Sequence, residues 1–491
     1  MLLRKRSFRV VLRRFSSSLD ISSQGVPQFQ RQEIISGLYE ACKGSMENFL
    51  GYQGTVNENY AIVAKYLNTR LNNVGDPFCL GYSQLNTKEV ETEVLKYYSD
   101  LWQAKLDPED PTACWGYVLS MGSTEGNIFS LYNAREYLGG KPLLLKTASP
   151  IQEDNYKEPV ILFSQETHYS ILKACSLIKL STMSEVGNKF YKDECPLGEK
   201  WPLSVPSYEC GGINVEALCI VAEFFASKGH PLVLNFNLGT TFKGACDQIR
   251  RASESVLKVL KKHNMLESGQ RNKYWIHIDG ALGASYIPYI EKAIDQDLIK
   301  EPPDFPFFDF RENYVHSIVT SGHKWIGAPW PCGVLMMRNE LRVNPVSEPS
   351  YIGTKDTTFA GSRNAISPLI LWEFHSKYSE QQKVEMACEG IKLASYLKQK
   401  LEDLESRLGY CIYVRHSPLS LAVRFLRPCE SILKKYSLCV EKETVSGQEM
   451  EFTHVFCMRH VSYGLLDQLC SDLVSHENPF PAYCGSNIYI N

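Results

Sequence analysis

The sequence has no closely spaced cysteine pair, little net charge and no apolar run long enough to span a membrane. Its 16 cysteines are scattered singly without CxxC spacing, which argues against a zinc site and against a small disulfide framework. The formal net charge of −3 leaves no basic footprint for nucleic acid. We therefore expect no metal site, no nucleic-acid partner and no membrane span, and we interpret the cysteines as buried thiols in a reducing compartment.

Residues 1–19 lack acidic side chains and combine apolar residues with a run of serines at 16–18. This Arg-rich, Ser-rich pattern is typical of an organelle transit peptide, and it lacks the long apolar core of a secretory signal. We expect import into the mitochondrion, with the plastid second; the alternative is a disordered basic tail on a cytoplasmic enzyme. The basic residues are Arg4, Lys5, Arg6, Arg9, Arg13 and Arg14.

Short apolar runs alternate with helical stretches between Trp115 and Arg338. Each run is long enough for a strand and too short for a core helix, and its continuous apolar character is typical of a strand buried on both faces. The alternation predicts an α/β fold with a mostly parallel sheet flanked by helices. The clearest strand candidates are residues 160–163, 232–236, 274–278 and 316–320.

Three parts of the chain follow the first 19 residues. We expect an irregular, partly helical N-terminal arm at 20–85 and a large α/β domain at 86–365. Residues 366–491 are expected to form a connecting helix and a small α+β domain. Within these parts the patterns predict helices at 88–104 and 366–404, a polar surface segment at 145–158, a loop at 341–365, and strands at 411–414, 419–425 and 452–458.

The most informative segment reads SGHKWIGAPWPCG at residues 321–333. Lys324 lies in a loop of small residues between apolar runs, which suits a lysine that forms an imine. Such a lysine needs a partly desolvated site, because burial lowers its pKa and frees the amine lone pair. The alternative is an ordinary surface lysine beside a turn. Cys332 follows closely, where its thiol is expected to be chemically accessible, and we assign it no role.

A carboxylate follows the apolar run at 274–278, in the segment WIHIDGA. Open α/β sheets bind their ligands at the carboxyl ends of strands, which is where Asp279 is placed. A carboxylate there can keep a pyridine nitrogen protonated, the condition that makes pyridoxal phosphate (PLP) an electron sink. The alternative for Asp279 is a helix N-cap or a turn.

Two further segments carry polar residues directly after apolar runs. In MGSTEGN, at 121–127, Ser123 and Thr124 precede a periodic helix, whose unpaired N–H groups and positive dipole end suit a phosphate. In ETHYS, at 166–170, His168 follows the strand candidate at 160–163 and could stack on a flat ring. A capped helix without ligand and an ordinary loop histidine are the alternatives.

Together and in this order, these segments resemble the group II PLP-dependent amino acid decarboxylases. The branch that they resemble most contains the histidine decarboxylases and the plant serine decarboxylases. The resemblance extends over roughly residues 48–475. Three further segments carry it: LNNVGDPF at 71–78, NLGTTFKGACD at 237–247 and DTTFAGSRN at 356–364.

The resemblance implies a fold-type-I PLP enzyme, a homodimer or higher homo-oligomer, and a role for each matching residue. Lys324 would hold PLP and Asp279 would keep its ring nitrogen charged. His168 would stack on one ring face while Ala281 packs against the other. Ser123, Thr124, Ser321 and His323 would surround the phosphate, Thr241 would lie near the ring hydroxyl, and Ser362 would reach the phosphate of a neighbouring subunit.

The reaction rests on the resemblance, because PLP also supports transamination, aldol cleavage and elimination. We expect decarboxylation of an L-amino acid to its amine; the alternatives are another PLP-dependent lyase that breaks a carbon–carbon bond, or a non-catalytic PLP-fold binding protein. Tyr351 is our candidate for protonating the α-carbon, with a packing tyrosine as the alternative. One departure puts histidine or serine specificity in doubt: Ala365 and Ile366 stand where the branch has Gly-His.

Overall fold

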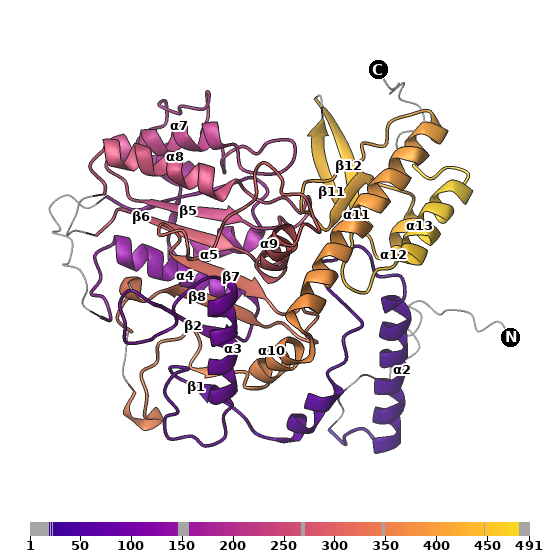
Figure 1. Ribbon diagram of the computed structural model, residues 1–491, viewed down its shortest axis with the longest axis horizontal. Coiled ribbons are helices and arrows are strands. Elements are labelled where there is room, and N and C mark those ends of the chain that lie inside the picture. Colours follow the sequence, from indigo (N-terminus) through magenta and orange to yellow (C-terminus); the bar gives the residue numbers. More distant parts are fainter. Residues whose placement is uncertain are drawn as a thin grey trace.

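The computed structural model describes residues 19, 21, 23–145, 157–266, 271–345, 349–445 and 447–480. The first 18 residues of the expected transit peptide and most of the polar segment at 145–158 lie outside the described residues. A seven-stranded sheet, a three-stranded sheet and a two-stranded ribbon organise the fold (Figure 1). Within the described ranges, no helix is both long and apolar enough to cross a membrane.

The seven-stranded sheet confirms the prediction of a mostly parallel α/β arrangement. Its strand order is β2-β8-β7-β6-β5-β3-β4. Strand β8 runs antiparallel to both its neighbours, and the other pairs are parallel. All four strand candidates are confirmed to within one residue at each end. The strands are β2 (Cys114–Leu119), β3 (Val160–Phe163), β4 (Ser181–Thr182), β5 (Leu232–Asn237), β6 (Tyr274–Asp279), β7 (Ser317–Ser321) and β8 (Gly333–Arg338).

Helices cover both faces of this sheet, which explains the continuous apolar runs of its strands. Leu232 and Leu234 of β5 pack with helices α7 (Val215–Ser227) and α8 (Ile249–Lys262). Val233, between them, points to the other face and packs with helices α4 and α5. Figure 1 shows α7 and α8 on one side of the strands and α4 on the other. The two helices that pack with Val233 are α4 (Ser123–Leu138) and α5 (Tyr169–Ile178).

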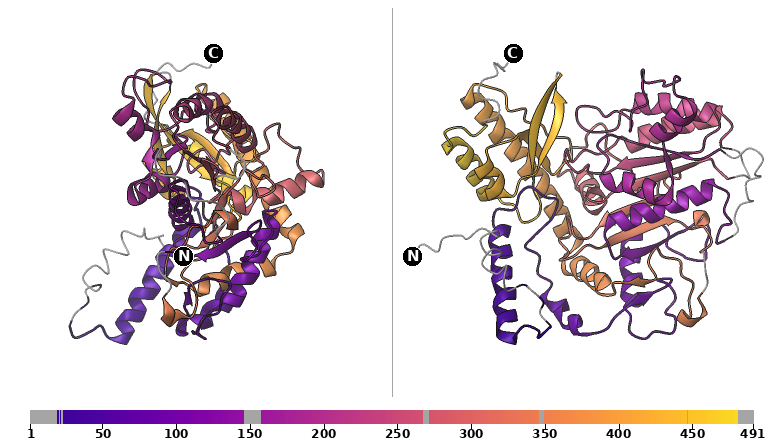
Figure 2. Two further views of the ribbon diagram at one scale, coloured as in Figure 1. Left: turned by 90° about the vertical axis from the view of Figure 1, so that its left-hand side faces the viewer. Right: turned by 180° about the vertical axis from the view of Figure 1, so that it is seen from behind.

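The remaining helices lie around the large sheet and in the N-terminal arm. Helix α2 has no buried residue and projects from the rest of the molecule (Figure 2). The predicted helix at 88–104 is present as α3, which ends three residues earlier. The bounds are α2 (Gln28–Met46), η2 (Ala61–Asn68), α3 (Lys88–Leu101), α6 (Met183–Phe190), η4 (Gly283–Ser285), α9 (Ile287–Asp295), η5 (Asn339–Leu341) and η6 (Ser350–Ile352).

The three-stranded sheet near the C-terminus is antiparallel, with the order β10-β12-β11. It contains the strands predicted at 419–425 and 452–458, although their ends differ. The strand predicted at 411–414 is wrong: Tyr413 has a positive φ of 52°, which interrupts the extended backbone. The elements are β10 (Ala422–Leu426), α12 (Glu430–Tyr436), β11 (Val440–Val445), β12 (Gln448–Phe456) and α13 (Tyr463–Ser475); the ribbon pairs β1 (Asn73–Val74) with β9 (Ser362–Arg363).

The single long helix predicted at 366–404 is also wrong, because the chain forms two helices. They are α10 (Ile366–Lys377) and α11 (Glu380–Leu408). Tyr378 between them has extended backbone angles, φ −107° and ψ 130°. Ser379 then starts α11 with a capping box, in which its side chain accepts from the N–H of Gln382 and the Gln382 side chain accepts from the N–H of Ser379. This cap favours a new helix over continuation of the old one.

Candidate active site

Strands β6 and β7 bring the two central polar residues of the sequence analysis to one edge of the sheet. The strands are parallel neighbours, with Asp279 opposite Val319. Asp279 is the last residue of β6, and Lys324 lies three residues after the end of β7. Since parallel strands end at the same edge, the carboxylate and the amine lie at the carboxyl side of the sheet.

Lys324 has the electrostatic surroundings that an amine nucleophile requires. Burial lowers the pKa of Lys324, and the attraction of Asp279 partly opposes that shift. The lowered pKa makes the neutral amine more accessible at neutral pH. The alternative of an ordinary surface lysine does not hold, because the side chain is partly buried.

The Asp279 carboxylate is 6% exposed and held by two donors. The backbone N–H of Ala281 donates to Oδ1 at 3.2 Å. The side-chain amide of Asn127 donates to Oδ2 at 2.9 Å. Asn127 lies in the second turn of α4, so this contact ties the end of β6 to the helix that begins with Ser123.

His168 lies in the same charged cluster, at the N-terminus of α5. Burial lowers the pKa of His168; Asp279 acts to raise it and Lys324 to lower it further. The Nδ1 atom accepts from the N–H of Ser170 at 3.2 Å and contacts the Ser170 hydroxyl at 2.8 Å. Nδ1 of His168 is thus held by Ser170, and the imidazole lies close enough to Asp279 and Lys324 for both to influence its pKa.

The first turn of α4 is shaped to receive a small anion. Gly122 precedes it with a φ of +70°, and a Cβ at this position would lie 2.6 Å from Cε1 of His323. The Ser321 hydroxyl accepts from the N–H of Ser123 at 3.2 Å and donates to the Ser123 hydroxyl at 2.9 Å. The predicted phosphate residues Ser123, Thr124, Ser321 and His323 thus gather where the helix dipole is positive.

Thr241 and Ala281 follow the ends of β5 and β6. Thr241 is exposed, and its backbone carbonyl accepts from the Gln53 side chain at 3.3 Å. Ala281 is partly exposed, and its carbonyl accepts from the N–H of Ser321 at 3.1 Å. Both residues therefore lie at the same sheet edge as Lys324.

Within one chain, Tyr351 and Ser362 are not among the residues gathered around Lys324. Tyr351 is 82% exposed in η6 and lines a cavity of about 100 Å³ together with Asn72. The Ser362 hydroxyl accepts from the Asn72 side chain at 3.0 Å. Both residues are thus placed beside Asn72, on the surface of the molecule.

Our expectation that the Cys332 thiol is chemically accessible is wrong. The side chain is fully buried, and burial raises the pKa of the Cys332 thiol to about 12. A Cβ at Gly322 would lie 2.6 Å from its sulfur. Cys332 therefore packs beneath the Lys324 loop as an inert thiol.

The backbone of the Lys324 loop is fastened by residues that the sequence analysis missed. Arg459, which precedes α13, donates to the carbonyls of Trp325 and Ile326 at 2.8 and 2.7 Å. It also pairs with Glu58 at 2.9 Å. From the N-terminal arm, the N–H of Thr55 donates to the Lys324 carbonyl at 3.0 Å. Contacts between residues so distant in sequence leave no local signal.

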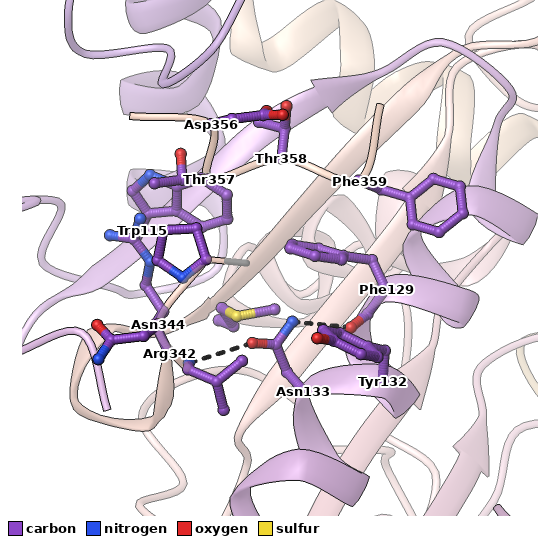
Figure 3. A pocket seen from close by; sticks show the side chains of 13 residues that line it. Trp115, Phe129, Tyr132, Asn133, Arg342, Asn344, Asp356, Thr357, Thr358 and Phe359 are labelled. Carbon is purple, nitrogen blue, oxygen red and sulfur yellow. Dashed lines mark hydrogen bonds between the residues drawn. The ribbon is translucent and has the colours of Figure 1, made fainter. Parts of the chain in front are cut away.

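A separate cavity of about 340 Å³ lies beside α4 (Figure 3). Trp115, Phe129, Tyr132 and Phe359 form aromatic walls, and Arg342 lies with its guanidinium 4.0 Å from the Trp115 ring centroid. Lys324, Asp279 and His168 do not line this cavity, so it is distinct from the charged cluster.

The family comparison agrees with this arrangement. The model of the pyridoxal-dependent decarboxylase conserved domain matches residues 30–407. Histidine decarboxylase from Solanum lycopersicum is 28% identical over 455 residues, which cover 92% of this chain and 90% of the relative. Serine decarboxylase 2 from Oryza sativa subsp. japonica is 27% identical over 465 residues, 93% of this chain and 82% of the relative.

Among solved structures, L-methionine decarboxylase from Streptomyces sp. 590, in complex with L-methionine methyl ester, is similar throughout. It is 37% identical with a TM-score of 0.87, and the match covers 93% of this chain and 97% of that chain. The chain therefore belongs to the pyridoxal-dependent decarboxylase family. It is a PLP-dependent amino acid decarboxylase, and the predicted fold class, cofactor and reaction are confirmed.

The residues present fit PLP. The pKa of the Lys324 amine is lowered, as imine formation requires. The Asp279 carboxylate is fixed at a strand end, where it can face a ring nitrogen. At Gly122 a Cβ would lie 2.6 Å from Cε1 of His323, so the lack of a side chain there lets His323 pack against the start of α4. Amine, carboxylate and anion cradle are the three recognition elements that this cofactor needs.

Replacing Arg459 by Met tests the fastening of the Lys324 loop. The side chains of Arg459 and Glu58 are 7% and 4% exposed, and breaking a buried pair costs about 3 kcal/mol. We expect a loss of about that size in the free energy of unfolding of the cofactor-free protein, measured in urea, and weaker PLP binding by titration.

Lys377→Met is the matched control, because Lys377 pairs with the same Glu58 but is 38% exposed, and its ammonium group donates to Glu58 and not to the loop carbonyls. It should cost less than about 1 kcal/mol and leave PLP affinity unchanged. Equal losses in the two variants would contradict a special role of Arg459.

Proposed function

We propose that the enzyme decarboxylates an L-amino acid with an uncharged, apolar side chain, with L-methionine as the best candidate. The observation that carries this proposal is Ile366, which replaces a polar histidine of the resembling branch by an apolar side chain. Ile366 begins α10 and packs against the main core, next to the buried Ala365. The 37% identity to the methionine decarboxylase supports the same choice.

In the proposed mechanism, PLP supplies an electron sink for the carbanion that remains when carbon dioxide leaves. Lys324 anchors the cofactor, and Asp279 holds a proton on its ring nitrogen. His168 and Ala281 would pack against the cofactor ring. Thr241 lies near the ring hydroxyl. The phosphate is bound by Ser123, Thr124, Ser321 and His323.

A second candidate is decarboxylation of histidine or serine, as the sequence motifs suggested. A polar substrate side chain would need polar partners in the pocket, because an unpaired buried polar group costs binding free energy. Ile366, at the position where the resembling branch has a histidine, offers none. Another lyase that breaks a carbon–carbon bond would release an aldehyde fragment in place of carbon dioxide.

Carbon dioxide release from a panel of L-amino acids tests the substrate proposal. We expect kcat/KM for methionine to exceed that for histidine or serine by at least about tenfold, since one misplaced polar group costs more than 1 kcal/mol. The purified protein with PLP should absorb above about 400 nm, and Lys324→Ala should abolish this band. A preference for histidine or serine would overturn the substrate assignment, and an aldehyde product would overturn the reaction.

We also propose that the enzyme is a homodimer whose subunits complete each other's sites. Tyr351 and Ser362 support this, because both are exposed and placed beside Asn72 on one chain's surface. The loop at 356–364 would carry Ser362 to the partner's phosphate, and Tyr351 would protonate the α-carbon there. Helix α2 adds apolar surface that a partner would cover; its exposed side chains include Phe29 (66%), Ile35 (67%) and Tyr39 (63%).

Subunit mixing tests this sharing. Lys324→Ala and Tyr351→Phe should each abolish most activity alone. When the two chains are co-expressed, half of the dimers are mixed and each holds one intact site, so about a quarter of wild-type activity should return. No recovery, or a monomeric mass by light scattering, would contradict the shared site.

For localisation, we propose import into the mitochondrion directed by residues 1–19, with the plastid or the cytoplasm as alternatives. The pattern of six basic and no acidic residues supports the proposal. A fluorescent protein fused to residues 1–30 should accumulate in mitochondria, while the same fusion with Arg4, Arg6, Arg9, Arg13 and Arg14 replaced by Gln should remain in the cytoplasm. Cytoplasmic fluorescence of the unmodified fusion would contradict it.

A further inference from the structure

One side-chain amide, that of Asn127, is linked to both groups proposed to touch the cofactor ring: directly to Asp279, and through Ser170 to His168. Asn127 is fully buried in α4. Its Nδ2 atom donates to Oδ2 of Asp279 at 2.9 Å and to the hydroxyl of Ser170 at 3.1 Å. Ser170 in turn contacts Nδ1 of His168 at 2.8 Å. The amide therefore lies between the carboxylate and the stacking histidine.

His277 determines which way this amide points. Its Nε2 atom lies 2.8 Å from Oδ1 of Asn127. Burial lowers the pKa of His277 to about 4, so at neutral pH the ring is uncharged and carries one N–H. Because a carbonyl oxygen only accepts, this hydrogen is on Nε2. Nδ1 then accepts from one of two hydroxyls, those of Ser130 and Ser317, which lie 3.0 and 2.9 Å away and are hydrogen-bonded to each other.

The donors along this chain of contacts all run in one direction. The indole N–H of Trp275, which only donates, contacts the Ser317 hydroxyl at 3.0 Å. At the far end, the Asp279 carboxylate only accepts. In the other branch, the Ser170 hydroxyl accepts from Asn127 and gives its single hydrogen to His168. A flipped Asn127 amide would set its oxygen against the carboxylate, so the network permits one orientation.

We propose that Asn127 is a positioning residue whose one amide sets the Asp279 carboxylate directly and the His168 ring through Ser170, the two groups that would hold the cofactor ring. The proposal rests on the proposed function, since it takes from there the roles of Asp279 and His168. Neutral His277 keeps the amide in its working orientation. Asn127 touches neither substrate nor cofactor in this account and acts only through its two partners.

Asn133 provides a matched comparison on the same helix. It is 2% exposed, against 0% for Asn127, but its partners are backbone groups: the Phe129 carbonyl at 2.9 Å and the N–H of Val343 at 3.3 Å. Loss of Asn133 removes a buried amide without disturbing the carboxylate. A comparison of substitutions at Asn127 and Asn133 therefore separates a positioning role from general packing.

The experiment compares Asn127→Leu with Asn133→Leu in the full-length enzyme. Both should lower the melting temperature of the cofactor-free protein, because each leaves polar groups unpaired. In Asn127→Leu alone, we expect the PLP dissociation constant to rise by about tenfold or more, the effect of one charge-assisted hydrogen bond. The absorbance of bound PLP should also become pH-dependent near neutrality in this variant.

Two further variants keep the test decisive if Asn127→Leu does not fold. Asn127→Asp has the same shape but opposes a second carboxyl to Asp279; the two would share a proton, and the same spectral change should follow. Ser170→Ala keeps the contact between Asn127 and Asp279 and removes only the hydroxyl that links Asn127 to His168. It should lower kcat while the absorbance of bound PLP keeps its wild-type dependence on pH.

The outcomes separate this proposal from the proposed function. If wild type shows no PLP band, the proposed function fails. If wild type binds PLP and Asn127→Leu matches Asn133→Leu in affinity and spectrum, Asn127 is only a packing residue and the positioning role is overturned. Wild-type spectra in Asn127→Asp would overturn it as well.

Discussion

The parallel pairing of β6 with β7 is the interaction on which the active site depends. It sets Asp279 and the Lys324 loop side by side at the carboxyl edge of the sheet. A shift of the register by one residue would turn every side chain of β6 to the opposite face. Asp279 would then point away from the cluster, and His277 would lose Asn127. The helices on both faces hold the register, because each strand packs apolar residues on both sides.

Around Asp279 and Lys324, burial lowers the pKa values of the basic side chains, whereas Asp279 acts to raise those of Lys324 and His168. Burial lowers the pKa values of Lys324, His168 and His323, so these groups are biased toward their neutral forms. The carboxylate of Asp279 is instead compensated by two hydrogen-bond donors. The site therefore places the hydrogen-bonded Asp279 carboxylate among bases whose pKa values are lowered by burial, which suits a cofactor whose ring carries a positive charge.

Several parts of the structure were predictable from the sequence because their signal is local. The buried strands have continuous apolar runs, and Asp279, Lys324 and Ser123 follow such runs directly. The break between α10 and α11 was missed, although Ser379 and Gln382 have the spacing of a capping box; the apolar pattern on either side of it hid the signal. The positive φ of Tyr413 has no sequence signature, since non-glycine residues rarely adopt it.

Contacts between distant segments could not be predicted. Asn127 is an unremarkable helix residue until β6 places Asp279 against it, 152 residues further along the chain. Which residues two subunits share is equally a property of the assembled molecule, and the positions of Tyr351 and Ser362 in one chain indicate it only through their exposure.

The contact between Arg459 and the Lys324 loop has a consequence for biosynthesis. Arg459 follows Trp325 by 134 residues, so a ribosome must translate the whole small sheet before the loop carbonyls receive their last donor. A nascent chain can form the large sheet earlier, since its strands end at Arg338. The Lys324 loop therefore receives its full set of backbone hydrogen bonds only after the segment that carries Arg459 has been made and has folded against it.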